Sequence, residues 1–161
     1  MEKFLMTPTG YSKLNMELNR LINDERPKVI DALKESRSYG GELSENAEYL
    51  EAKDAQDNLE KKIMEIQNKL NNAKVVKIED IVDDKVARFG TIVKLLDLDT
   101  EEELEYQIVG LEESDIKQFK ISYLSPIGSA MLNKRVGDII YFRIPNGDRE
   151  LEILDVKIPK I

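Results

Sequence analysis

The chain has 161 residues, 35% of them charged, and a formal net charge of −8 at pH 7. It contains no cysteine and no histidine, which excludes disulfides, thiol chemistry, and imidazole as a ligand, nucleophile or base. The acidic balance argues against tight nonspecific binding to free nucleic acid. No apolar run approaches the roughly 20 residues of a membrane span, and the N-terminus is too polar for a signal peptide. We therefore expect a cytoplasmic protein with no membrane partner.

The first half of the chain, from Thr7 to Ala73, has the apolar spacing of helices. Thr7 and Pro8 form a helix start, with Thr7 as the N-cap and Pro8 as the first helical residue. Pro27 removes one backbone hydrogen bond inside this helix, and we expect a bend there and not a stop, because the apolar spacing resumes in register after it. The residues of this apolar stripe are Leu14, Leu18, Leu21, Ile22, Val29, Ile30 and Leu33.

Gly40 and Gly41 interrupt the helical pattern. Beyond them lies a second, narrower stripe of Ala52, Leu59, Ile63, Ile66, Leu70 and Ala73. About two apolar residues per heptad suit pairing with one partner helix. We predict two helices of about 30 residues, each about 45 Å long, joined by the glycines into a long antiparallel coiled-coil hairpin. The turn then forms its tip, about 40 Å from the base.

After Ala73 the pattern changes to strands. Runs of β-branched and aromatic residues predict strands within residues 87–100, 101–110, 117–124 and 137–156, and Asn146 with Gly147 predicts a hairpin turn in the last of them. Residues 125–138 predict one short helix, with Ser125 as its N-cap and Pro126 in its first turn. The acidic segment 97–103 is interpreted as a solvated hairpin connection. The chain is thus α+β, with a helical hairpin at 1–76 and a small antiparallel β domain with one short helix at 77–161.

The tip, residues 40–49, concentrates carboxylates. Glu42, Glu45, Glu48 and Glu51 occur at every third position, and neither Lys nor Arg lies between Arg37 and Lys53. One interpretation is a solvated helix start, because acidic side chains are favoured near the positive end of a helix dipole. The other is metal chemistry. Two exposed carboxylates alone bind Mg²⁺ poorly, so such a tip has to complete a site that belongs to another molecule. The residues alone leave both interpretations open.

The sequence of the tip also resembles a motif of a known protein family. "GELSENAEYLEAK" at 41–53 is similar to the "GDLSENAEYxxAK" motif of the bacterial Gre transcript-cleavage factors. The similarity runs along the chain through "TPTGYSKL", "RPKVIDAL", "LNNAKVV", "FGTIVKLLDLDT", "DIKQFKISYLSPIGSAML" and "VGDIIYFRIPNGDRELEIL". It implies a coiled-coil hairpin followed by a C-terminal domain of FKBP-like fold.

The resemblance also implies a partner and an activity. Factors of this family bind bacterial RNA polymerase, with the C-terminal domain at the rim of the secondary channel and the hairpin inside it. The tip acids help to hold a second Mg²⁺ against the nascent RNA 3′ end of a backtracked complex, and the active site of the polymerase then cleaves the transcript. The factor itself is not an enzyme. We expect a monomer that binds no Mg²⁺ by itself and shares the ion with the polymerase.

Carried onto this sequence, the motif implies Glu42 and Glu45 as the catalytic, metal-binding acids. Glu42 stands where the family motif has Asp, and "SYGGEL" has one residue more than the common pattern, so both changes alter the reach of the tip. Glu48 and Glu51 lie further along the helix and are not expected to be catalytic. The expected contacts to RNA or polymerase are Arg37, Asn46, Tyr49, Lys53, Ser125 and Pro126, of which Asn46 and Tyr49 are expected to shape the tip. A helix-surface role for Arg37 and Lys53, and a simple helix cap at Ser125, are the structural alternatives.

Two other functions are considered. A channel-binding inhibitor of RNA polymerase has the same architecture, and the altered tip is compatible with it. A peptidyl-prolyl isomerase or chaperone is suggested only by the FKBP-like fold that the resemblance implies, and a fold does not carry a function. The C-terminal half lacks the density of aromatic residues expected around a proline pocket, and the chain has no Trp.

Overall fold

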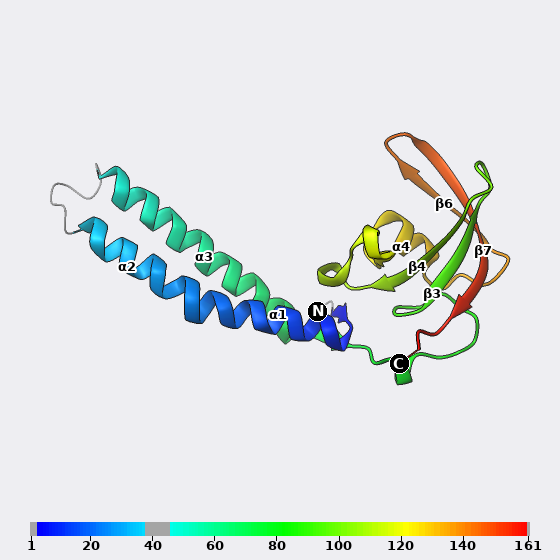
Figure 1. The fold of residues 1–161 in the computed structure, drawn as a ribbon, viewed down its shortest axis with the longest axis horizontal. Coiled ribbons are helices and arrows are strands. Elements are labelled where there is room, and N and C mark those ends of the chain that lie inside the picture. Colours follow the sequence, from blue (N-terminus) through cyan, green and yellow to red (C-terminus); the bar gives the residue numbers. More distant parts are fainter. Residues whose placement is uncertain (1–2, 38–45, 161) are drawn as a thin grey trace. The chain divides into compact units, whose positions relative to one another are not determined.

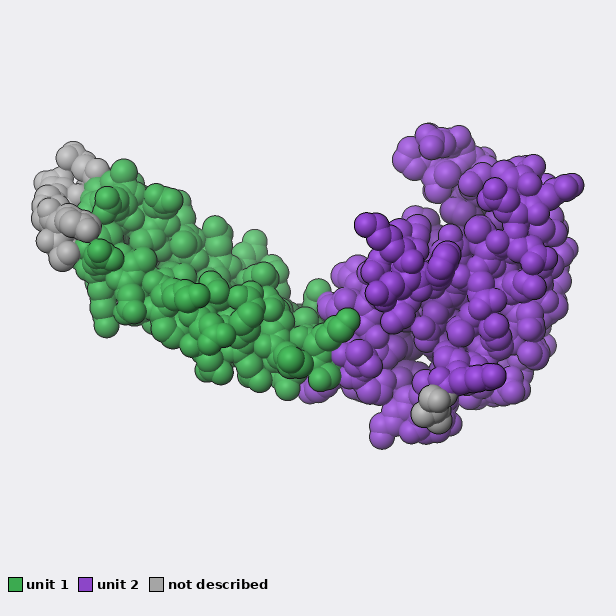
Figure 2. Space-filling view, in the orientation of Figure 1, with its two compact units in different colours: residues 1–2, 12–72 green, residues 3–11, 73–161 purple. Residues whose placement is uncertain are grey.

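The computed structural model describes residues 3–37 and 46–160 and divides the chain into two compact units, which are coloured separately in Figure 2. One unit contains Ser12–Asn72, and the other combines Lys3–Tyr11 with Ala73–Ile161. The sequence predicted a domain boundary between residues 76 and 77, and this stays a prediction. In the structure, residues 3–11 and 73–76 make their contacts mainly with the unit that contains the sheet. The α+β class and the order of a long helical hairpin followed by a β domain are confirmed (Figure 1).

The first arm of the hairpin is helical from Pro8 to Arg37, in three consecutive segments (Figure 1). Gly10 N–H donates to Thr7 Oγ1 at 3.1 Å, so Thr7 is the N-cap that the sequence predicts. The segments are α1 (Pro8–Arg20), a π-helical turn (Leu21–Glu25) and α2 (Arg26–Arg37). Arg26 N–H donates to the carbonyl of Leu21, five residues back. Pro27 follows directly, so this wide turn accommodates the residue that cannot donate, and the helix continues as predicted.

The second arm of the hairpin is the helix α3 (Ala47–Asn71), which packs along α2. The buried apolar residues of this unit are few and belong to the predicted stripes: Leu14, Leu21, Leu33, Ile63 and Ile66. Arg26 donates to both carboxylate oxygens of Glu60 at 2.8 and 2.9 Å, which joins the two helices beside the seam. The prediction that the helix reaches Ala73 is wrong. Ala73 begins β2 (Ala73–Val75), which pairs in parallel with β1 (Phe4–Met6), a contact between segments too far apart for local patterns to predict.

The second unit is built on a twisted five-stranded sheet in the order β5-β4-β3-β7-β6 (Figure 1). Its strands are β3 (Ile92–Asp97), β4 (Glu103–Val109), β5 (Lys120–Ser122), β6 (Ile139–Ile144) and β7 (Gly147–Lys157). Three 3-10 turns complete it: Ile78–Asp80, Leu111–Glu113 and Ile116–Gln118. The core is formed by alternating inward residues of the sheet and by Met131 of α4 (Pro126–Met131).

Two details of the sheet correct the sequence prediction. The sheet is not wholly antiparallel, because β5 pairs with β4 in parallel. Residues 110–119, which contain two 3-10 turns, return the chain to the same end of the sheet, and strand propensity carries no information on direction. The β6–β7 hairpin is confirmed, but Ile144 pairs with Gly147, so the central turn residues are Pro145 and Asn146. Gly147 has a φ of +123°, which explains the glycine at this position.

The predicted short helix is confirmed as α4, and its start is tightly built. Ser125 is the N-cap, and its Oγ accepts from Gly128 N–H at 3.1 Å and donates to the carbonyl of Ser122 at 2.7 Å. A Cβ on Gly128 would overlap that carbonyl oxygen. The helix therefore begins close against the backbone that follows β5.

The connection between β3 and β4, residues 98–102, is solvated, whereas Asp97 at the end of β3 is not. Asp97 is buried, and its Oδ1 accepts from the N–H groups of Asp99 and Thr100 at 2.9 and 3.2 Å. Arg149 Nη1 lies 3.4 Å from Oδ2. Burial by itself raises the pKa of Asp97, but the two backbone donors and Arg149 outweigh it, so the pKa lies below its usual value. Asp97 is thus a structural carboxylate that holds the turn.

We predict that Gly128→Ala destabilises the second unit. The methyl group forces Ser122 away from the start of α4, and overpacking of this kind lowers the free energy of unfolding by about 1–3 kcal/mol. Urea denaturation followed by near-ultraviolet circular dichroism of the tyrosines measures this. Ser129→Ala, at an exposed position of the same helix, is the control and is expected to change stability by less than about 0.5 kcal/mol. Equal midpoints for the two variants would contradict the prediction.

We also predict acid-sensitive stability from Asp97. A carboxyl whose folded-state pKa is depressed contributes stability that is complete above its unfolded pKa, about 3.9, and is lost as the pH falls through the folded value. The free energy of unfolding should therefore decrease below about pH 4. In Asp97→Asn this decrease should be shallower, and stability at pH 7 should be lower because the pairing with Arg149 is lost. Asp148→Asn, which alters an exposed pair with Arg143, is the control and should change stability at pH 7 by less than about 0.5 kcal/mol.

Candidate functional site at the hairpin tip

The two predicted catalytic acids, Glu42 and Glu45, lie outside the described residues, as does the rest of segment 38–45. The described chain reaches this segment from Arg37, the last residue of α2, and leaves it at Asn46, directly before α3. The site is therefore built here from the residues on its two sides. Of the predicted contact residues, Arg37, Asn46 and Tyr49 lie together at this end of the hairpin, and Lys53 follows on α3.

Asn46 joins the two helices through one side-chain amide. Its Oδ1 accepts from Tyr49 N–H at 3.1 Å, which makes it the N-cap of α3. Its Nδ2 donates to the backbone carbonyl of Ser36 on α2 at 2.9 Å. Ser36 is itself buried and donates from Oγ to the carbonyl of Leu33 at 2.7 Å. One residue thus caps one helix and satisfies a carbonyl in the last turn of the other.

Arg37 and Tyr49 form a second contact between the same helices. The guanidinium carbon of Arg37 lies 5.5 Å from the centre of the Tyr49 ring, within the range of a cation–π interaction. The backbone N–H of Tyr49 is the group capped by Asn46, so this residue takes part in both contacts. Arg37 remains exposed and keeps a positive charge beside the tip.

Lys53 lies one helical turn beyond Tyr49 on α3. Its Nζ donates to Gln56 at 3.2 Å and lies 3.6 Å from Asp57, so its described partners lie further along its own helix. These contacts fit a helix-surface role. An exposed i,i+4 pair is weak and leaves the ammonium group free to exchange partners.

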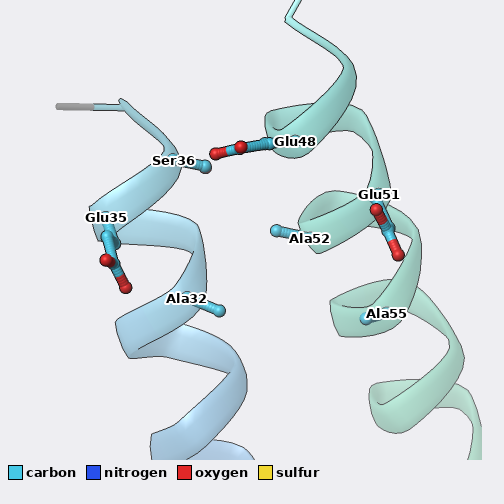
Figure 3. Close-up of a pocket in the computed structure, with 7 residues that line it drawn as sticks. All are labelled: Ala32, Glu35, Ser36, Glu48, Glu51, Ala52 and Ala55. Carbon is cyan, nitrogen blue, oxygen red and sulfur yellow. The ribbon is translucent and has the colours of Figure 1, made fainter. Parts of the chain in front are cut away.

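A shallow groove of about 420 Å³ runs between α2 and α3 below the tip (Figure 3). Small side chains form it: Ala32 on α2 faces α3, and Ala52 and Ala55 lie on α3. The carboxylate of Glu48 extends toward Ser36 on the facing helix (Figure 3). Glu35 and Glu51 complete the lining and make this end of the hairpin acidic on the helices as well as in the predicted tip.

The remaining predicted residues, Ser125 and Pro126, belong to the second unit, where Ser125 caps α4. Sequence reasoning missed the apolar pocket beside them, which has a volume of about 420 Å³. Leu111, Ile116 and Leu124 contribute exposed side chains to its lining. The signal available in the sequence was the presence of these apolar residues in turn-rich segments, where polar residues are expected. An exposed patch of this kind is typical of a surface that contacts another protein.

Within residues 3–37 and 46–160, no three acidic side chains converge into a group that could hold a metal ion. Carboxylate oxygens are the ligands that Mg²⁺ prefers, so the chemistry of Glu42 and Glu45 fits that ion, although two ligands are too few to enclose it. Over the same described residues, no helix combines the length and the apolar character needed to cross a membrane.

Comparisons with known proteins cover almost the whole chain. Residues 4–75 match the family described as "Transcription elongation factor, N-terminal", and residues 82–158 match "Transcription elongation factor, GreA/GreB, C-term". The transcription elongation factor GreA of Beijerinckia indica is 45% identical over 97% of this chain and 98% of its own length, and that of Brucella canis is 45% identical over 98% and 99%. A crystal structure of the GreA factor homolog 1 (Gfh1) of Thermus thermophilus is 26% identical over 96% of this chain and 99% of its own, with a TM-score of 0.43.

Both halves of the chain thus match the same family, and the identity to its members extends from the capped start of α1 through the tip to β7. The chain belongs to the GreA/GreB family of transcription elongation factors.

Proposed function

We propose that this protein enters the secondary channel of bacterial RNA polymerase and stimulates Mg²⁺-dependent cleavage of the 3′ end of backtracked transcripts. The polymerase is the enzyme in this proposal, and the protein lends it side chains. The observation that carries the proposal is the similarity, over nearly the full chain, to proteins named transcription elongation factor GreA. The outcome is the release of arrested elongation complexes.

The hairpin supports this proposal by its length and its narrowness. The 25 residues of α3 extend over about 37 Å at 1.5 Å per residue. Its seam buries only a narrow apolar stripe, so a two-helix rod needs no further helix to cover it. A rod of this kind can carry its end into a channel that a globular domain cannot enter.

The acids of the tip have a defined part in the proposal. Glu42 and Glu45 supply carboxylate oxygens to a site that the polymerase completes. When bound there, Mg²⁺ supplies Lewis-acid activation of the phosphodiester and of the attacking water. Residues 38–52 contain neither Lys nor Arg, so no cation within that segment competes with Mg²⁺ for these carboxylates. Arg37 and Lys53 bring positive charge to the same end of the hairpin for contact with RNA.

The second unit is proposed to dock on the polymerase at the rim of the channel. Its support is the apolar pocket beside Ser125 and Pro126, with Leu111, Ile116 and Leu124 exposed around it. This docking surface belongs to the second unit, and the proposal assigns the channel to the hairpin unit. Protein docking surfaces typically combine exposed apolar side chains with a polar rim.

The first test measures RNA cleavage in a halted, backtracked elongation complex with Mg²⁺. We expect the parent to release short 3′ fragments, and Glu42→Ala and Glu45→Ala each to reduce the rate at least about 10-fold, which corresponds to 1.4 kcal/mol of transition-state stabilisation. Glu51→Ala, at an exposed position of α3 further from the tip, is the control and should cleave like the parent.

Two results would count against the proposal. If both tip variants cleave at the parental rate, the acids are not ligands. If the parent gives no fragments and instead lowers run-off synthesis, the protein is a channel-binding inhibitor with the same architecture. Accelerated refolding of a proline-limited substrate would support the isomerase alternative.

The second test concerns docking and separates a loss of folding from a loss of contact. Ser125→Ala removes the cap of α4 and should lower the free energy of unfolding by about 1 kcal/mol, whereas Ile116→Asp, at an exposed position in the lining of the pocket, leaves the cap intact. We expect Ile116→Asp to fold near parental stability and to bind polymerase less tightly in a competition assay, because it places a charge in the apolar pocket. Parental affinity of Ile116→Asp would remove this surface from the proposed interface.

A further inference from the structure

We propose that Asn46 is a positioning residue, and that its bond to Ser36 together with the Arg37–Tyr49 contact forms an interhelical clasp that fixes the two ends of segment 38–45 relative to each other. The clasp is defined by Ser36, Arg37, Asn46 and Tyr49. Its role in transcript cleavage rests on the proposed function, whereas its role in the hairpin itself does not.

The buried apolar seam between the two helices does not reach the tip end of the hairpin. The buried apolar residues of α3 are Ile63 and Ile66, which lie in its second half. In the half nearer the tip the helices face each other through small side chains such as Ala32 and Ala52, which leave the groove of Figure 3. On α2 the last buried apolar side chain is Leu33. Apolar packing therefore weakens toward the end of the hairpin where position matters most.

At the tip end of the hairpin, polar contacts join the two helices in place of apolar packing. The Asn46 amide uses its acceptor for α3 and its donor for α2, at 3.1 and 2.9 Å. The carbonyl it binds is held in turn, because Ser36 is buried and donates to Leu33. Helix ends leave their last carbonyls without intrahelical partners, so this bond satisfies a group that otherwise needs water. Arg37, the residue after Ser36, adds a contact to Tyr49, whose N–H is capped by Asn46.

The presence of Asn at position 46, and not of another capping residue, supports the clasp. Asp, Ser and Thr cap helices about as well as Asn. An ionised Asp has no donor, and the hydroxyl of Ser is too short to serve both helices. Only an amide caps α3 and also donates to α2 from the same position. The cap explains a small polar residue at position 46, and the clasp explains why it is Asn.

The clasp fixes the points at which the chain enters and leaves the segment that contains Glu42 and Glu45. A catalytic group is effective only when it is held close to its productive position, and a displacement of about 1 Å can cost about 100-fold in rate. Residues that hold the ends of the segment therefore act on the reaction through the tip acids, without touching the substrate themselves.

The test compares Asn46→Asp and Asn46→Ser with the parent. Both variants keep the cap and lose the donor to Ser36, and only Asp adds a charge. Because the chain has no cysteine, cysteines introduced for Lys34 on α2 and Asp54 on α3 can carry spin labels at defined sites. We expect a narrow interhelical distance distribution in the parent and a broader one in both variants, with unchanged helix content by far-ultraviolet circular dichroism. Tyr49→Phe keeps the ring contact and should resemble the parent.

In the cleavage assay, both Asn46 variants are expected to lose about 10-fold or more in the maximal rate at saturating factor, with polymerase affinity within about 2-fold of the parent. A merely structural cap predicts no loss in either variant. Unchanged distance distributions in both variants would overturn the clasp. A defect confined to Asn46→Asp would also overturn it, because the added charge would then be the cause. If the parent itself fails to stimulate cleavage, the proposed function fails and the distances alone decide whether the clasp exists.

Discussion

The hairpin depends on an apolar stripe that stays in register on both sides of Pro27, a residue that cannot donate a backbone hydrogen bond. Pro27 has no N–H to donate, and a regular helix would lose its bond to the carbonyl of Asn23 and clash with it. The π-helical turn at Leu21–Glu25 widens the backbone just before the proline, and α2 resumes with Leu33 buried. The bidentate pair between Arg26 and Glu60 joins the helices at the same level. The seam, and with it the position of the tip, follows from this local adjustment.

Apolar packing stabilises one end of that seam, and polar contacts stabilise the other. Buried side chains such as Ile63 and Ile66 hold the half of α3 that is distant from the tip, and beyond Leu33 of α2 an amide hydrogen bond and a cation–π contact join the helices. Apolar packing tolerates small shifts, whereas hydrogen bonds fix direction and distance. The change from one to the other coincides with the change from a supporting rod to the site that it carries.

Much of the fold was predictable because its signals are local. The caps at Thr7 and Ser125 need only a few adjacent residues, and both are confirmed. The helical stripes were predictable because their spacing repeats many times. The parallel pairs β1–β2 and β4–β5 were not, since pairing direction depends on segments remote in sequence. Ala73 was assigned to the helix because one more apolar residue fitted the spacing, although its strand partner is Phe4.

For the candidate site, the motif identified which residues matter but not what they touch. Asn46 and Tyr49 were expected to shape the tip, and the sequence carried no sign that Asn46 bonds to Ser36 ten residues earlier. Lys53 was grouped with Arg37 by charge, while its described partners are Gln56 and Asp57. The pocket beside Ser125 was missed because it forms only when residues 111–127 fold against one another.

The grouping of residues 3–11 with the sheet has a consequence for how this protein is built. The chain leaves the second unit after Tyr11 and returns to it at Ala73, so the hairpin is an insertion tethered at both of its ends. Met6 is almost completely buried, Leu5 N–H donates to Tyr123 Oη at 3.2 Å, and Thr7 N–H donates to Glu113 at 3.3 Å. A fragment that starts at residue 77 leaves these partners behind. The sheet unit is discontinuous in sequence, so a continuous version of it would have to join the segment 3–11 to residue 73 through a linker in place of the hairpin.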